Sequence, residues 1–399
     1  MAFILGRDIK FFCKLETINS PAANYGTPSQ PRYAGASNAA RVLSTSMDFT
    51  VARENRNDAR ATRSALGRIT GKQEVSWSVE SYMCPKSGAV PNIAPLLECA
   101  MGSVATTTYS LATELNTFQM ARLSEGVMRE EVFGCWVDEM TLSASGGDPV
   151  TISFSGGACE YALTGIATTN ATSSGKGLTV ATGGTNFMPG SLIAIADVTA
   201  TDGTVVSGST SATDVRLATS RSYATSKAVT PHTPDGTYTT HGDPITGISG
   251  TLSLDSETTL NVTAFDLTVN NGIKPLSDEF AEKGTSNFIE GFREITGTVT
   301  VRATSDALTK FQKRYQLARP ALGNPTSDTV GPAPTFQTLA LTITLGNVSA
   351  AKQVITLPAV ELGFAGIDIP EAEEATIAIP FTALATASNN EMTFEWNAS

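Results

Sequence analysis

The sequence predicts a β-dominated α+β protein, built from two tandem copies of one sheet-rich unit with one helix each. A small all-β module is inserted between the copies. Three observations support this prediction. Long stretches alternate apolar and polar residues with a period of two, which is typical of strands with one buried face. A unit of strand, long loop and strand occurs twice, and the stretch between the copies is rich in Thr, Ser, Ala and Gly.

The repeated unit is clearest in residues 263–304, where two alternating stretches flank a long polar loop. The sequence FDLTV at Phe265–Val269 has a counterpart in MDFTV at Met47–Val51. After both, a polar loop ends in an Ile-Thr-Gly triplet, at Ile69 and at Ile295, that leads into a second strand. Since the apolar positions keep the same parity in both copies, we predict an internal duplication.

The first copy begins with a short strand or arm within Met1–Leu15. An extended connection follows at Ile18–Val42, which carries three prolines. After the strand–loop–strand unit, Pro91–Met101 has apolar residues near helical spacing and is predicted to form a short helix. Residues 127–145 and 148–161 then form a hairpin around a Ser-Gly-Gly-Asp turn.

The inserted module is predicted from a change of texture near Gly165. Short strand candidates at Leu178–Ala181, Leu192–Ala196 and Val215–Ala218 alternate with Gly-rich turns. The alternative is a disordered linker, but the regular spacing of strands and turns favours a small barrel or sandwich. We place its boundaries at residues 165–246, which leaves 1–164 and 247–399 for the two copies.

The second copy resumes near Ile248 and is predicted to have its own helix at Ser305–Leu317, which a serine or aspartate caps and a proline follows. Alternation in Thr335–Leu345 predicts a strand that pairs as a hairpin with Lys352–Phe364. Two closing strands follow, marked by apolar residues at alternate positions: Ile377, Ile379 and Phe381, then Met392, Phe394 and Trp396. The class is therefore α+β with strands dominant.

Composition limits the kind of partner. The net charge of -11 and the pI of about 4.8 argue against a protein that grips nucleic-acid phosphates, although an acidic surface lets DNA pass without sticking. Charged residues make up only 16%, which suits a β protein that pairs much of its surface with copies of itself. No apolar stretch approaches the ~20 residues of a membrane span. The N-terminus lacks the apolar run of a signal peptide, so we expect synthesis in a cytoplasm.

The five cysteines are an odd number and form no C-x-x-C pair. This pattern predicts buried free thiols in a protein made under reducing conditions. All five lie in the first 160 residues: Cys13, Cys84, Cys99, Cys135 and Cys159.

Catalytic patterns are weak. His232 and His241, the two histidines, lie in Pro- and Gly-rich context within the module, where solvated loop residues are a better interpretation than a metal site or a hydrolase triad. A phosphate loop around Lys176 lacks its first glycine, because Ala171 stands there, and Gly177 replaces the magnesium-binding hydroxyl. We therefore expect no enzyme activity, no cofactor and no metal.

The two long loops have opposite charge. In residues 52–68 five arginines outnumber two acidic residues, for a net charge of +3, whereas in residues 270–294 five acidic residues outnumber three basic ones, for -2. Two solvated loops would explain this equally well. The alternative hypothesis is a complementary contact between neighbouring subunits, individually weak but able to set register and orientation. Its candidate residues are Arg53, Arg56, Arg60, Arg63, Asp278, Glu279 and Glu282.

On these residues the chain resembles the tail tube (major tail) proteins of long-tailed, non-contractile bacteriophages, of the duplicated-domain type. The resemblance depends on the strand–loop–strand unit with its Ile-Thr-Gly triplet, on LTVNNGIKP at Leu267–Pro275 and on ITGISGTLSLD at Ile245–Asp255. It implies two β-sandwich or half-barrel units, each with one flanking helix, and an outer module as decoration. It also implies trimeric rings with pseudo-sixfold symmetry that stack into a hollow tube.

The same resemblance implies partners and location. The partners are copies of the chain itself, the tape-measure protein inside the tube, the tail terminator and distal tail proteins, and DNA in non-specific passage, with no membrane contact. The location is the virion tail after synthesis in the host cytoplasm. Glu74 and Glu80 are candidates for facing the channel. The alternative function is a capsid-decoration, baseplate or adhesin protein that binds a host glycan through the module.

Overall fold

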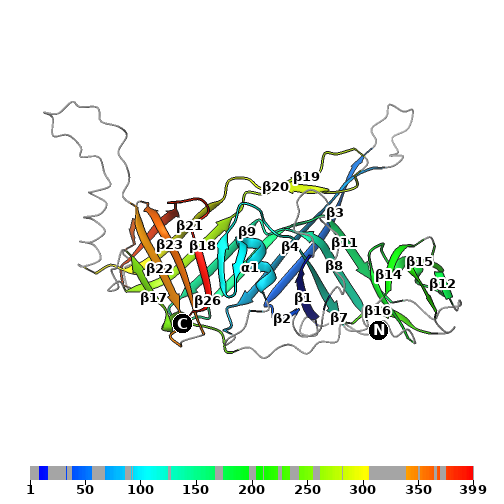
Figure 1. The fold of residues 1–399 in the computed structure, drawn as a ribbon, viewed down its shortest axis with the longest axis horizontal. Helices are drawn as coiled ribbons and strands as arrows, with labels where there is room; N and C mark the ends of the chain where they lie inside the picture. The colour runs from blue at the N-terminus through cyan, green and yellow to red at the C-terminus, as the bar shows by residue number, and fades with distance from the viewer. Residues whose placement is uncertain are drawn as a thin grey trace.

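A computed structural model describes most of the chain, and its strands dominate (Figure 1). Its single described helix is α1 (Ala94–Met101), which ends at Gly102 in the left-handed conformation (φ 97°). This helix confirms the one predicted at Pro91–Met101. The helix predicted at Ser305–Leu317 lies outside the described residues, which are 9–16, 33, 38–55, 68–85, 91, 93–124, 127–166, 174–196, 204–209, 211–222, 227–233, 242–254, 261–280, 282–304, 338–348, 351–363, 366–368 and 374–398.

The first unit is a sandwich of two antiparallel layers. Its inner layer has the order β3-β4-β10-β9, and its outer layer has the order β11-β8-β7-β1-β2. Apolar side chains from both layers, such as Trp77 and Phe118 with ring centroids 5.2 Å apart, fill the core between them. The strands are β1 (Ile9–Leu15), β2 (Ala39–Ala40), β3 (Ser44–Asn55), β4 (Arg68–Tyr82), β7 (Phe118–Ser124), β8 (Met128–Cys135), β9 (Glu139–Ser145), β10 (Thr151–Ala158) and β11 (Glu160–Thr164).

The second unit repeats this arrangement. Its inner layer runs β18-β21-β25-β24, and its outer layer runs β17-β22-β23-β26. The β5–β6 ribbon that follows α1 pairs with β26 and so ties the first unit to the outer layer of the second. The strands are β5 (Gly102–Ala105), β6 (Thr108–Leu111), β17 (Thr251–Leu254), β18 (Val262–Asn270), β21 (Glu294–Arg302), β22 (Leu339–Leu345), β23 (Lys352–Leu362), β24 (Gly366–Asp368), β25 (Thr376–Ala383) and β26 (Thr393–Ala398).

The two units agree strand by strand, in chain order as well as in pairing. A register shift in β7–β8, between Phe118 and Met120, has its counterpart in β22–β23, between Leu339 and Leu341. Aligning these shifts makes Leu142 on β9 the equivalent of Ile367 on β24, since each follows the shifted hairpin at the same distance. The two residues stand opposite Ile152 and Ile377 respectively. Each unit thus places an apolar pair at the same point.

The sequence motifs that indicate the repeat do not superpose in this alignment. Leu267, rather than Phe265, stands where Met47 stands, because Leu267 pairs with Gly297 and Met47 pairs with Trp77. MDFTV and FDLTV are therefore displaced by two residues, and the Ile-Thr-Gly triplets by six. Both displacements are even, so every side chain keeps its face of the sheet.

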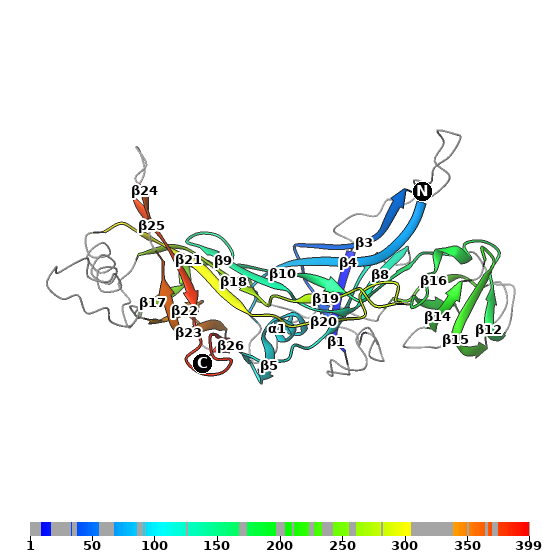
Figure 2. The ribbon, with the colours of Figure 1, turned by 90° about the horizontal axis from the view of Figure 1, so that it is seen from above.

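One junction joins the inner layers into a continuous sheet. Strands β9 and β18 pair antiparallel over seven positions, from Ala264 opposite Ser145 to Asn270 opposite Glu139. Figure 2 shows that this sheet is curved. Its two ends, β24 with β25 and β3 with β4, rise on the side away from α1 and β1, so the sheet is concave on the side that the outer layers do not cover (Figure 2).

The inserted stretch forms a five-stranded antiparallel sheet of order β12-β15-β14-β13-β16 at one end of the molecule's long axis (Figure 1). Its strands cover the three candidates of the sequence and add two more. It has a separate apolar core around Phe187, Leu178 and Leu217, as short alternating strands of a sandwich require. The strands are β12 (Ser174–Thr179), β13 (Leu192–Ile195), β14 (Thr204–Ser209), β15 (Asp214–Ser222) and β16 (Val229–Pro231).

The predicted loops are shorter than expected. β3 runs to Asn55 and β4 starts at Arg68, so the ends of the predicted loop 52–68 are strand, and Arg53 stands opposite Thr70. In the second unit the loop contains a small ribbon of β19 (Lys274–Leu276) and β20 (Asn287–Ile289). The expected extended connection at Ile18–Val42 also contributes to a core, because Tyr33 and Ala39 are buried with Phe12.

Candidate subunit interface

The inner sheet ends in two edges that match the strands of its own central junction. β9 pairs with β10 on one side and β18 on the other, whereas its equivalent β24 pairs only with β25 in the described part of the chain. Likewise β18 pairs with β21 and β9, whereas its equivalent β3 pairs only with β4 there. Unpaired strand edges template pairing with another chain. The outer edges of β3 and β24 are thus complementary in kind.

The internal junction shows what such pairing needs. Leu142 and Leu267 stand opposite one another on the core face and are both buried. On the other face the Ser143 hydroxyl donates a hydrogen bond to the Asp266 carboxylate. In the alignment of the units, Met47 of β3 and Ile367 of β24 occupy the positions of the two leucines, and Ser46 and Asp368 occupy those of Asp266 and Ser143. The serine–aspartate pair recurs with its members exchanged.

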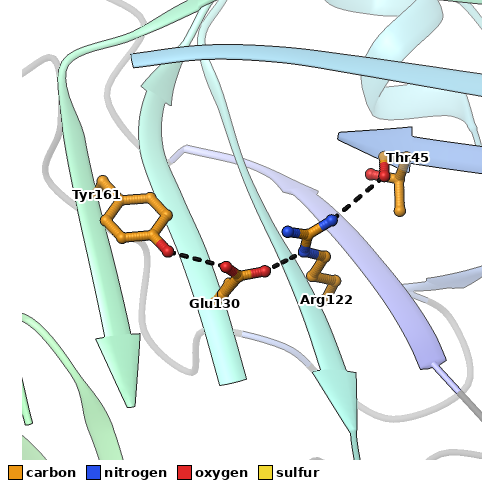
Figure 3. A network of polar contacts seen from close by, with 4 residues as sticks. All are labelled: Thr45, Arg122, Glu130 and Tyr161. Carbon is orange, nitrogen blue, oxygen red and sulfur yellow. Dashed lines mark hydrogen bonds and ion pairs between the residues drawn. The ribbon is translucent and has the colours of Figure 1, made fainter. Parts of the chain in front are cut away.

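A polar network holds the edge strand β3 against the outer layer (Figure 3). The Tyr161 hydroxyl donates to Glu130 at 2.8 Å, Glu130 forms an ion pair with Arg122, and Arg122 donates to the Thr45 carbonyl of β3 at 3.3 Å. The Tyr161 ring stacks on Phe49 of β3 at 5.2 Å. Burial raises the pKa of Tyr161, and the hydrogen bond to Glu130 raises it further, so the hydroxyl keeps the proton that it donates. β3 is thereby positioned from both ends.

The concave face of the inner sheet is polar across both units. Glu74 is exposed, and Glu80 is half-buried and accepts a hydrogen bond from the Ser44 hydroxyl at 3.2 Å. Because side chains alternate along each strand, this face presents hydroxyls and carboxylates while the other face fills the core. One cross-strand row runs through Ser44, Glu80, Ser153, Thr141, Thr268, Thr296 and Thr382.

The acidic loop lies beside the first hairpin of its own chain. The Lys72 ammonium donates to the carbonyls of Ser277 and Glu279, and the Gln73 amide donates to the Lys283 carbonyl at 2.7 Å. Asp278, Glu279 and Glu282 are exposed there, and Arg53 is exposed on β3. No ion pair among the described residues joins Arg53 to the three carboxylates. The other predicted residues, Arg56, Arg60 and Arg63, lie outside the described part of the chain.

A buried arginine fixes the inserted sheet to the first unit. Arg129 of β8 is fully buried, forms a 2.7 Å ion pair with buried Glu131, and donates to the His232 carbonyl at 2.6 Å. Its guanidinium also lies over the ring of Tyr33, 5.3 Å from the centroid. The interpretation of His232 as a solvated loop residue is wrong, because the segment after β16 packs on this arginine. His241 lies outside the described residues.

Side chains with reactive groups are not gathered into a site in the described ranges. No group of three His, Cys, Asp or Glu that could hold a metal occurs there, and no helix found there is long and apolar enough to cross a membrane. The cysteines are free; three are buried and two half-buried. Burial raises the pKa of Cys13 and of Cys159 to about 12, so these thiols stay protonated and unreactive near neutral pH.

Sequence reasoning missed both edges and both polar clusters. The alternation of Met47 and its neighbours marks β3 as a strand but does not say that the strand lies at an edge. Arg129 and Glu131 stand two residues apart in MREEV, a pattern that is common at protein surfaces. The one available signal was the run of four charges in seven residues, within a stretch otherwise predicted to pair as strand.

Comparison with known families agrees with this architecture. The phage tail tube protein family matches residues 6–383, nearly the whole chain. No curated protein matches the sequence. The family is structural, it assembles with itself, and its place is the tail of the virion. The chain, with its two β-sandwich units and its paired sheet edges, belongs to the phage tail tube proteins.

Proposed function

We propose that three copies of the chain close into a ring of pseudo-sixfold symmetry, and that such rings stack into the tail tube. Each chain supplies two units, so three chains supply six. Each unit arose by duplication of one ancestral unit. In this proposal residues 1–164 and 247–399 are the tube units, and residues 165–246 form an outer decoration.

The β9–β18 junction is the single observation on which the ring depends most. It joins two equivalent units side by side, and the same edges recur, unpaired in the described residues, at β24 and β3. Repeating one junction at every step is what a closed ring requires of a heterologous contact. The concave curvature of the sheet (Figure 2) supports closure in the same direction.

The concave polar face would then line the channel, with Glu74 and Glu80 among its carboxylates. A negative wall repels DNA phosphates and so keeps the passing duplex from binding. In this proposal the channel holds the tape-measure protein during assembly and conducts DNA afterwards. The ends of the tube meet the tail terminator and distal tail proteins of a long-tailed, non-contractile phage.

The alignment predicts the register of the intermolecular junction. Leu142 stands opposite Leu267 and Ser143 opposite Asp266, so Ile367 of one chain should stand opposite Met47 of the next, and Asp368 opposite Ser46. Side chains of opposite residues lie ~4.5–5.5 Å apart at Cβ, which is within reach of a disulfide.

The test is a pair of cysteines, Ser46→Cys with Asp368→Cys, oxidised in the purified full-length protein. We expect covalent trimers on a non-reducing gel and hollow tubes by electron microscopy. The control is Thr50→Cys with Asp368→Cys, displaced by four residues or ~13 Å along β3, which should not cross-link. Compact monomers in the micrographs would refute the ring, whereas tubes that cross-link only through the control pair would refute the register alone.

A further inference from the structure

We propose that Phe292 of one copy inserts into a hollow at the far ends of β9 and β18 of a copy in the next ring. This inference rests on the proposed function, because it concerns how rings stack. The observation is that one chain carries a fully exposed aromatic residue at one end of its central junction and an apolar hollow at the other.

Phe292 is fully exposed to solvent. It lies in the segment 271–293, which leaves the sheet where Asn270 stands opposite Glu139 and returns to it at Glu294. That segment, with β19 and β20, runs along the upper side of the molecule in Figure 1, above the ends of the inner strands. A phenyl ring held in water at the end of a sheet marks a contact that forms on assembly.

The backbone around Phe292 is fixed. Gly272 adopts φ +59°, and a Cβ atom there would lie 2.7 Å from the Phe292 carbonyl oxygen, so only glycine allows this approach. Arg293 donates to the Asn271 side chain at 3.3 Å and to the Ala112 carbonyl, and Glu290 accepts from the Leu115 amide at 3.4 Å. Burial lowers the pKa of Arg293, in agreement with its enclosed position. A ring presented on so ordered a turn loses little entropy on binding.

The hollow lies at the opposite end of the same two strands, where Ala264 stands opposite Ser145. It has a volume of about 60 Å³ and opens to solvent between β18 and the β17–β22 pair. Its wall is mainly apolar or glycine, and Ile248, which is 76% exposed, lies next to it in sequence. The main lining residues are Ala144, Gly146, Leu252, Val262, Phe265 and Ile343.

A projection and a hollow at opposite ends of one junction make a heterologous contact, which repeats without closing and generates a filament. Rings stacked in this way all point in one direction. The projection of the last ring and the hollow of the first remain free, which are the two ends that terminator and distal proteins would meet.

The test separates the two halves of the contact. Phe292→Ala removes the projection. Gly146→Leu blocks the hollow without a clash, since a Cβ atom at Gly146 meets only the Thr263 carbonyl oxygen, at 3.7 Å. We expect each variant to form trimers but no tubes, because each lacks one side of every contact. Mixed together, they should form pairs of rings and nothing longer, because the Gly146→Leu ring supplies Phe292 and the Phe292→Ala ring supplies the hollow.

Control and contrary outcomes are distinct. Ile166→Ala removes another exposed apolar side chain, 49% exposed at the foot of the inserted sheet, and should leave the tubes unchanged. Tubes of normal length from Phe292→Ala, or a mixture that yields no ring pairs, would overturn the inference while leaving the ring intact. Absence of trimers from the unmodified chain would instead refute the proposed function.

Discussion

The two units of this protein place a large aromatic ring at the same point of the inner sheet but take it from different strands. In the first unit Trp77 on β4 stands opposite Gly156 on β10; in the second Phe381 on β25 stands opposite Gly297 on β21. β4 corresponds to β21, and β10 to β25, so the large and small partners have exchanged strands. Packing at this point requires a ring and a gap, and the sheet can take the ring from either side.

The outer layers differ more. The cross-strand pair Arg122–Glu130 in the first unit corresponds to Ile343–Ile355 in the second, and Arg129 corresponds to Val354. The first unit has charges where the second has a plain apolar core. Those charges contact features that only the first unit has: the inserted sheet through His232, and the edge strand β3 through Thr45. Ion pairs thus occur where the core has an additional segment to hold.

The largest effect is expected from breaking the buried pair of the first unit. Glu131→Ala should destabilise the protein by ~3–5 kcal/mol, because it leaves the Arg129 charge buried without its carboxylate. The double variant Arg129→Val with Glu131→Thr, which copies Val354 and Thr356 of the second unit, should recover most of that loss. Urea denaturation measures both. If the double variant is as unstable as the single one, the two outer layers are not interchangeable at this point.

The ring-and-gap comparison predicts a slightly smaller effect. A Cβ atom at Gly297 would lie 2.3 Å from the Asp266 carbonyl oxygen and 2.4 Å from the Phe381 ring, so Gly297→Val should cost ~3 kcal/mol through overpacking. Phe381→Gly added to Gly297→Trp should be more stable than Gly297→Trp alone, because it restores the arrangement of the first unit. Thermal unfolding of both variants gives the ranking, and equal melting temperatures would contradict the exchange.

An intermediate effect is expected at Arg122 and Glu130. Glu130→Ile alone should destabilise by ~1–3 kcal/mol, because Arg122 is left half-buried without its partner. Arg122→Ile with Glu130→Ile should return to near the original stability, since the second unit has this pair. It should still assemble less well, because β3 loses the hydrogen bond to its Thr45 carbonyl. Denaturation and sedimentation separate the two results; normal assembly of the double variant would show that β3 needs no such support.

The smallest effect concerns the two loops and should appear only in assembly. Reversing Arg56 and Arg60 to Glu is expected to slow tube formation, and Asp278→Lys with Glu279→Lys is expected to restore it in part, because the loops of adjacent subunits carry opposite charge. Light scattering at low and high salt follows the rates, and screening should reduce the difference. Unchanged rates at low salt would mean that both loops are merely solvated.

Much of the fold could be predicted from the alternation of residues. Strand faces such as that of Val150 follow from period two, and α1 follows from helical spacing with a proline start. The repeat was inferred from motifs that are displaced by two and six residues in the structure, and it remained legible because even displacements preserve the faces. The strand order, the curvature and the exposed edges could not be read, because they depend on which strands pair across hundreds of residues.

The β9–β18 junction has a consequence for the kinetics of assembly. In a ring of three two-unit chains, half of the six junctions are made as each chain folds, at the high effective concentration of a covalent link. Only three remain to be made by collision, so ring formation becomes a third-order rather than a sixth-order process. Linking the units also lets them diverge, so that a decoration such as the β12–β16 sheet is repeated every 120° around the axis and the intervening positions stay bare.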